Sequence, residues 1–144
     1  MESTKGRTAT HNARAMPTPC TPAVNLSSAP ASPAERWAVE GGDAASTTLT
    51  IPADARRERR FEIACAVTVG VPEAAVAPWL QVSVQANGTL LWRRRTAAHN
   101  PGAWDGLDYR FSRSVPVGQA LRITVGVGGQ GVRRRSLVIE ADEI

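Results

Sequence analysis

The sequence predicts an all-β protein, an antiparallel two-sheet β-sandwich of about eight strands. Three observations lead to this fold class. Apolar residues fall on alternate positions from Phe61 onward, and Gly, Pro and Asn separate the alternating runs. No run between them has the period of an amphipathic helix, which argues against a parallel sheet built from βαβ units. Without its N-terminal tail the chain has about 110 residues, the size of one ordinary domain.

The clearest strand is 61–71, in which every odd position is apolar and the even positions are small or polar. A second run, 80–86, alternates as strictly and leads through Asn87-Gly88 into 89–92. Asn-Gly between two such runs is typical of a hairpin turn.

The register of this hairpin follows from where its apolar side chains would gather. A three-residue loop, 86–88, with Gly88 in a left-handed conformation opposes Val82 to Trp92 and Val84 to Leu90, which collects the large apolar residues on one face. A two-residue loop would oppose Ser83 to Trp92 instead. We therefore expect the three-residue loop, with Trp92 in the core.

The remaining strands follow the same pattern. They are expected at 108–115 with Tyr109 and Phe111 inward, at 120–127 with Leu121, Ile123 and Val125 inward, at 132–141, and at the shorter runs 36–40 and 47–51. Jelly-roll, immunoglobulin-like and fibronectin-like sandwiches share this patterning. The Cys-Trp-Cys spacing of an immunoglobulin domain is absent, and the long excursion between Trp92 and Tyr109 favours a jelly roll.

Residues 1–34 have a different composition from the rest of the chain. They hold five of the ten prolines among many Thr, Ala and Ser residues, so we expect a disordered tail before a single domain at 35–144.

No apolar stretch typical of a signal peptide or of a membrane span is visible. These observations leave the localisation unknown, with the cytoplasm as the default. Cys20 in the tail and Cys65 on an inward position do not indicate a disulfide.

Arginines are clustered rather than in large excess. The formal charge is +4, from 17 basic and 13 acidic residues, and half of that excess lies in 1–34. The clusters are Arg93, Arg94 and Arg95; Arg133, Arg134 and Arg135; and Arg56 and Arg57 with Arg59 and Arg60. At strand margins such residues discourage edge-to-edge association, and the alternative is a patch that contacts an anion. Few aromatic residues are interleaved with them, which argues against a specific nucleic-acid partner.

The connection 99–109 concentrates polar and aromatic groups in a Gly/Pro-rich segment. Its candidate ligand-binding residues are His99, Asn100, Trp104, Asp105 and Asp108. An indole face can cover the C–H face of a sugar ring while carboxylate and amide groups bind its hydroxyls. The alternative is a lid, in which Trp104 folds over one end of the sandwich and Asp105-Gly106 is only a turn.

The residue types needed for several chemistries are scarce. The chain has two histidines, His11 and His99, and neither they nor the cysteines have zinc-ligand spacing. Acidic residues near the chain's first and last strands leave calcium open without matching a calcium-loop pattern. No nucleophile motif or phosphate-binding glycine loop is present. We expect no enzymatic activity, no cofactor and no metal site.

One segment carries a resemblance. Residues 109–125, Tyr-Arg-Phe-Ser-Arg-Ser-Val-Pro-Val-Gly-Gln-Ala-Leu-Arg-Ile-Thr-Val, look like the late hairpin of small jelly-roll carbohydrate-binding modules. The resemblance implies an accessory module that recognises a ligand rather than transforming it.

Two functions of different class follow from the sequence. The first is a non-catalytic module that binds a saccharide or an anionic ligand through 99–109. The second is a structural or protein-interaction sandwich, which associates with a protein partner or with its own copies, or contacts an anion, through the arginine clusters. An exposed Trp104 beside a concavity would favour the first function.

Overall fold

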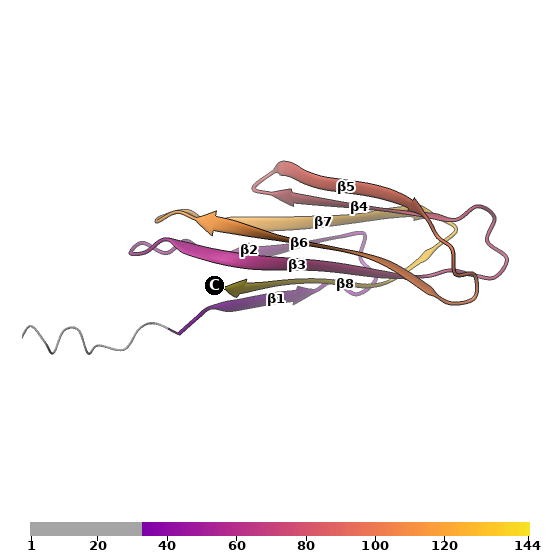
Figure 1. Ribbon diagram of the computed structural model, residues 1–144, viewed down its shortest axis with the longest axis horizontal. Helices are drawn as coiled ribbons and strands as arrows, with labels where there is room; N and C mark the ends of the chain where they lie inside the picture. The colour runs from indigo at the N-terminus through magenta and orange to yellow at the C-terminus, as the bar shows by residue number, and fades with distance from the viewer. Residues whose placement is uncertain (1–32) are drawn as a thin grey trace, which may run out of the picture. The chain divides into compact units, whose positions relative to one another are not determined.

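The computed structural model describes residues 33–144 and confirms the all-β class, with two antiparallel four-stranded sheets (Figure 1). The predicted tail, 1–34, lies almost entirely outside the described residues. The strands are β1 (Arg36–Glu40), β2 (Ser46–Ile51), β3 (Arg59–Gly70), β4 (Trp79–Ala86), β5 (Thr89–Ala97), β6 (Trp104–Val115), β7 (Leu121–Gln130) and β8 (Arg133–Glu143). Within 33–144 no helix is long and apolar enough to cross a membrane.

The two sheets interleave along the chain. Sheet A has the strand order β1-β8-β3-β6, and sheet B has the order β2-β7-β4-β5. Every connection between consecutive strands passes from one sheet to the other, except the β4–β5 hairpin. Because the chain alternates between sheets, residues far apart in sequence become neighbours, and β3 pairs with both β6 and β8.

The core follows the predicted alternation. On β3 the odd positions Phe61 to Val69 are buried, and they face the buried positions of β4 and β7 from the other sheet. Leu121, Ile123 and Val125 are buried as expected, while Tyr109 and Phe111 are half-buried against the same core. One buried face per strand is what a two-layer sandwich requires.

The β4–β5 hairpin corrects the predicted register. Asn87 and Gly88 both have positive φ, 49° and 83°, and form a two-residue turn in which Ala86 pairs with Thr89. A bulge at Leu91 follows, so Val84 pairs with Trp92. The predicted three-residue loop and its Val82–Trp92 pairing were therefore wrong.

The bulge also explains which side chains of this hairpin face inward. One extra residue on β5 reverses the alternation, so Trp92 reaches the core side despite the shorter loop. Trp92 is half-buried against the core, as its predicted inward position requires, whereas Leu90 opposes Gln85 on the other face and is 44% exposed. The expectation that Leu90 points inward was wrong.

Candidate ligand-binding site

A tight turn delivers Trp104 to the outer face of sheet A. Gly102 has a φ of +78°, and the Ala103 amide donates to the Asn100 carbonyl at 3.0 Å. Pro101 and Gly102 therefore occupy the two central positions of a turn that needs a left-handed third residue. Hydrogen bonds between this turn and Val71, at 2.7 and 3.0 Å, fix it beside the end of β3. Trp104 then begins β6 directly opposite Gly70.

Trp104 and Arg135 meet across Gly70. The indole is 54% exposed, and the Arg135 guanidinium carbon lies 4.2 Å from its ring centroid, within range of a cation–π contact. A Cβ atom at Gly70 would lie 3.2 Å from Arg135 Nε. The missing side chain on β3 therefore leaves room for residues from the two flanking strands to touch.

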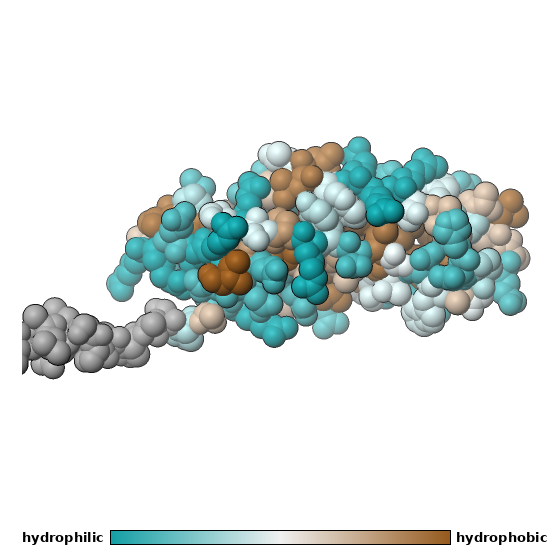
Figure 2. Space-filling view, viewed as in Figure 1, coloured by the Kyte–Doolittle hydropathy of each residue, from teal (hydrophilic) through white to brown (hydrophobic). Residues whose placement is uncertain are grey.

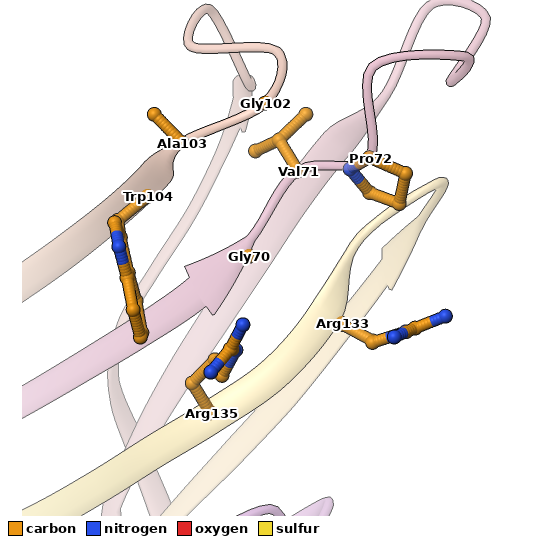
Figure 3. A pocket seen from close by; sticks show the side chains of 8 residues that line it. All are labelled: Gly70, Val71, Pro72, Gly102, Ala103, Trp104, Arg133 and Arg135. Atoms are coloured by element: carbon orange, nitrogen blue, oxygen red, sulfur yellow. The ribbon is translucent and has the colours of Figure 1, made fainter.

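A bulge in β8 places Arg135 on this face. Thr68 pairs with Ser136 and Val69 with Arg134, so Arg135 has no partner on β3. Strict alternation would have pointed Arg135 inward with Leu137. The extra residue turns its side chain outward, toward Trp104 (Figure 3).

These residues border a cavity of about 250 Å³. Its lining consists of Gly70, Val71, Pro72, Gly102, Ala103, Trp104, Arg133 and Arg135 (Figure 3). The lining thus combines apolar surface, backbone groups and two guanidinium groups, and it contains no carboxylate. Such a site can hold a small ligand that has an apolar face and a negative or polar edge.

A shallow groove of about 400 Å³ continues along the outer face of sheet A. It exists because small residues, Ala64, Ala66 and Gly106, occupy the centre of the sheet. Asp108 and Arg110 of β6 line one side, and Val138 and Glu140 of β8 line the other. Trp104 and Gly106 are on the same face of β6, so the cavity and the groove follow one another along the sheet.

The predicted residues of 99–109 have different roles in the structure. The carboxylate of Asp105 accepts hydrogen bonds from the His99 and Gly106 amides at 2.9 and 3.0 Å, and the Asn100 side chain donates to the Trp104 carbonyl at 3.1 Å. Asp105 and Asn100 therefore hold the turn that presents Trp104. Asp108 lines the groove, and His99 is exposed without lining the cavity. The lid alternative does not describe Trp104, which is largely open to solvent.

The arginine clusters do not converge. Arg133 and Arg135 border the cavity on sheet A, whereas Arg134 donates to the Asp43 carbonyl at 2.8 Å. Arg93 and Arg95 stand opposite Ser83 and Gln81 on the outer face of sheet B, and Arg94 stands opposite Val82. The Arg95 guanidinium lies 3.7 Å from the Trp79 ring centroid. The sandwich thus carries two Trp–Arg contacts on opposite faces.

Two arginines of the third cluster, Arg57 and Arg59, form an ion-pair network near the strand ends. Arg59 is 4% exposed and donates to Glu35 at 2.9 Å and to the Pro52 carbonyl at 2.7 Å. Arg57 bonds to Glu35 at 2.9 Å and to Glu143. The Arg57 hydrogen bond lowers the pKa of Glu143, and the Arg56 amide lowers the pKa of Asp54. Arg57 and Arg59 are therefore paired with acidic residues of the same chain.

Sequence reasoning missed Gly70, Val71 and Pro72, which form the floor of the cavity. The sequence contains a feature that could have indicated them, the Gly-Val-Pro triplet at the end of the predicted strand 61–71. Proline ends strand pairing, and glycine leaves space where a side chain would stand. Among residues 33–144, no group of three His, Cys, Asp or Glu residues is arranged to hold a metal ion.

Comparisons with known proteins add one structural likeness. No family model matches the chain, and no curated protein sequence matches it. Among solved structures, the chain is similar to part of dimeric latent PorU from Porphyromonas gingivalis, with 17% identity and a TM-score of 0.45. The similarity covers 74% of this chain and 10% of the PorU chain, so the chain spans about a tenth of that protein's length.

Proposed function

We propose that the sandwich is a non-catalytic module that binds a saccharide on the outer face of sheet A, with Trp104 as the stacking surface. The observation that carries this proposal is the 54% exposure of Trp104 beside a cavity of about 250 Å³. Large aromatic side chains are usually well covered in folded proteins, and an exposed indole beside a concavity can cover the apolar face of a sugar ring.

The neighbouring groove supports a ligand longer than one sugar. The groove runs along the sheet from Thr68 and Gly106 to Ala64. Ala64 lies six residues before Gly70 on β3, which corresponds to about 20 Å at the usual rise of about 3.3 Å per strand residue. Asp108, Arg110 and Glu140 on its sides supply acceptors and donors for hydroxyl groups.

The fold that we propose for this module is a jelly roll. Its support is the pair of strand orders, in which each sheet alternates early and late strands of the chain.

Glycan-array binding followed by isothermal titration calorimetry tests this function. Trp104→Ala is expected to raise the Kd by at least about tenfold, about 1.4 kcal/mol, with the melting temperature within a few degrees of the parent. Trp79→Ala is the matched control, since Trp79 also contacts an arginine but lies on the opposite face. An unchanged Kd for Trp104→Ala, or no saccharide bound by the parent chain, would refute the proposal.

A second candidate function is association with a protein through the free edge of sheet B. Leu90 on β5 is 44% exposed, and β5 has a neighbour on only one side. The face in Figure 2 is mostly hydrophilic with separate hydrophobic patches, one of them over β5. Size-exclusion chromatography with light scattering at low and high salt tests self-association. A strictly monomeric profile at both salt concentrations argues against it.

A further inference from the structure

We propose that the saccharide bound at Trp104 is anionic, with a uronate carboxylate or a sulfate ester held by Arg135 and Arg133. This inference rests on the proposed saccharide-binding function and adds the charge of the ligand. Both arginines come from the first residues of β8 and border the same cavity as Trp104 (Figure 3).

The charge of the cavity is entirely positive. Its two ionisable lining residues are arginines, and among residues 33–144 no Asp or Glu oxygen lies within 4 Å of either guanidinium. Glu73 lies beside Gly102 but does not line the cavity. An anion entering here would therefore meet two cations that have no carboxylate partner in this part of the chain.

The arginines at the opposite end of the sandwich provide the contrast. Arg57 and Arg59 are paired with Glu35, and Arg36 lies 3.6 Å from Glu140. Other arginines on the surface also lack acidic partners, but Arg133 and Arg135 are the pair that shares a cavity with an exposed indole. The presence of two arginines and an exposed indole in one cavity, rather than the positive charge alone, favours a ligand that has both an anionic group and an apolar face.

The position of Arg135 suits an anion that presents two neighbouring oxygens, as carboxylate and sulfate groups do. Its guanidinium lies 4.2 Å from the indole centroid, so stacking restricts its orientation, and neither arginine donates a side-chain hydrogen bond within 33–144. A guanidinium presents its N–H groups as a fork that matches carboxylate and sulfate oxygens. Arg133 is exposed and extends from the same strand, with its side chain pointing away from Trp104 and Arg135 (Figure 3). It therefore adds a second positive charge at the margin of the cavity rather than beside the indole.

The bulge in β8 is the local structural feature that makes this site. Without the extra residue, Arg135 would follow the inward alternation of Leu137 and could not contact Trp104. Gly70 supplies the second condition, because a Cβ atom would lie 3.2 Å from Arg135 Nε. Bulges that re-aim a side chain are common at binding sites.

The test compares matched neutral and anionic polymers on the full 144-residue chain. Dextran and dextran sulfate form one pair, and methyl-esterified and free polygalacturonate form the other, with affinity measured by biolayer interferometry at two salt concentrations. We expect one anionic polymer to bind at least tenfold more tightly than its neutral twin, and this preference to shrink as salt rises. The polymer pair that shows the preference identifies the group as sulfate or carboxylate.

Two double variants separate site from net charge. R133Q/R135Q is expected to lose the preference for the anionic polymer, while R93Q/R95Q, which removes the same charge from the opposite face, keeps it. Circular dichroism melts confirm that both variants fold.

Each remaining outcome is decisive. Equal binding of neutral and anionic polymers, abolished by Trp104→Ala, overturns the anionic ligand but leaves the saccharide-binding function intact. Equal loss in both double variants shows a net-charge effect and overturns the inference. Absence of binding to every polymer and every array saccharide refutes both proposals.

Discussion

The indole of Trp92 lies parallel to the ring of Tyr109, with their centroids 4.6 Å apart and 6° between their planes. Trp92 is on β5, the edge strand of sheet B, and Tyr109 is on β6, the edge strand of sheet A. Phe111 extends the stack at 5.4 Å from Tyr109. Three half-buried aromatic rings thus join the two sheets along the side where β5 and β6 lie at their edges (Figure 1).

Replacing Trp92 should test this aromatic stack. We expect Trp92→Ala to lower the free energy of unfolding by about 2–3 kcal/mol, less than for a fully buried indole because Trp92 is half-buried. Trp92→Phe, which keeps a ring in the stack, should lose less. Urea denaturation measures both changes. A loss below about 0.5 kcal/mol for Trp92→Ala would show that the rings are not what joins the edges.

Two strand glycines form a matched pair for a packing test. A Cβ atom at Gly106 would lie 2.7 Å from the backbone oxygen of Val67, whereas a Cβ atom at Gly128 would meet nothing within 4 Å. Gly106→Ala should therefore destabilise the protein by about 1–3 kcal/mol, because a paired strand must shift. Gly128→Ala should be neutral or stabilise it by up to about 1 kcal/mol, by restricting the unfolded chain. Thermal unfolding of both variants checks the order, and the reverse order would contradict this packing.

The ion pairs at the chain's first and last strands predict an acid-dependent stability. The Arg57 hydrogen bond lowers the pKa of Glu143 below its ordinary value of 4.5, so near and below that pH the unfolded chain binds more protons than the folded one. The free energy of unfolding should hence be independent of this group above about pH 5 and fall as the pH drops through the folded-state pKa. Chemical denaturation at a series of pH values measures the slope.

The Glu143→Gln variant isolates this contribution. It should be less stable than the parent at neutral pH and show a shallower decrease in acid, since the group that titrates is gone. Glu58→Gln removes an exposed carboxylate outside the network and serves as the control. Identical slopes for the parent and Glu143→Gln would mean that the pair with Arg57 does not contribute.

The buried thiol should be inert in the folded protein. Cys65 is 2% exposed, and burial raises its pKa to about 12, so almost no thiolate forms at pH 8. In a Cys20→Ser background, Cys65 should resist a thiol reagent under native conditions and react fully in guanidinium chloride. The absorbance of the released thiol dye measures the rate. Fast modification of the native protein would indicate that β3 opens locally.

The β4–β5 hairpin shows where local reasoning reached its limit. Alternation and the Asn-Gly dipeptide predicted the two strands and the turn, but a bulge at Leu91 changed the register. Trp92 does lie on the inward face as predicted, but it does so because of the bulge, which the alternation of apolar residues does not reveal. A bulge depends on how the strand bends against its neighbours, so it leaves no periodic signal in one strand's own residues.

The candidate site was likewise predictable only in part. Trp104 was predicted as a ligand-binding residue because an indole can cover a sugar ring, and in the structure it lies beside a cavity with Arg133 and Arg135. Asn100 and Asp105 were expected beside a ligand, and their hydrogen bonds hold the loop backbone instead. Short polar side chains in a tight turn satisfy nearby amides and carbonyls first, which residue type alone does not reveal.

The sequence by itself determined the β class, the approximate positions of the strands and most of the inward faces, because burial of one face imposes a two-residue period on each strand. It placed the start of β6 at Asp108 rather than Trp104 and pointed Leu90 inward, and both expectations were wrong. The tertiary structure decided which strands became neighbours, and so that Trp104, Gly70 and Arg135 meet across β6, β3 and β8. These contacts depend on strand order and on the bulge before Ser136, both of which arise from packing between segments distant in the chain.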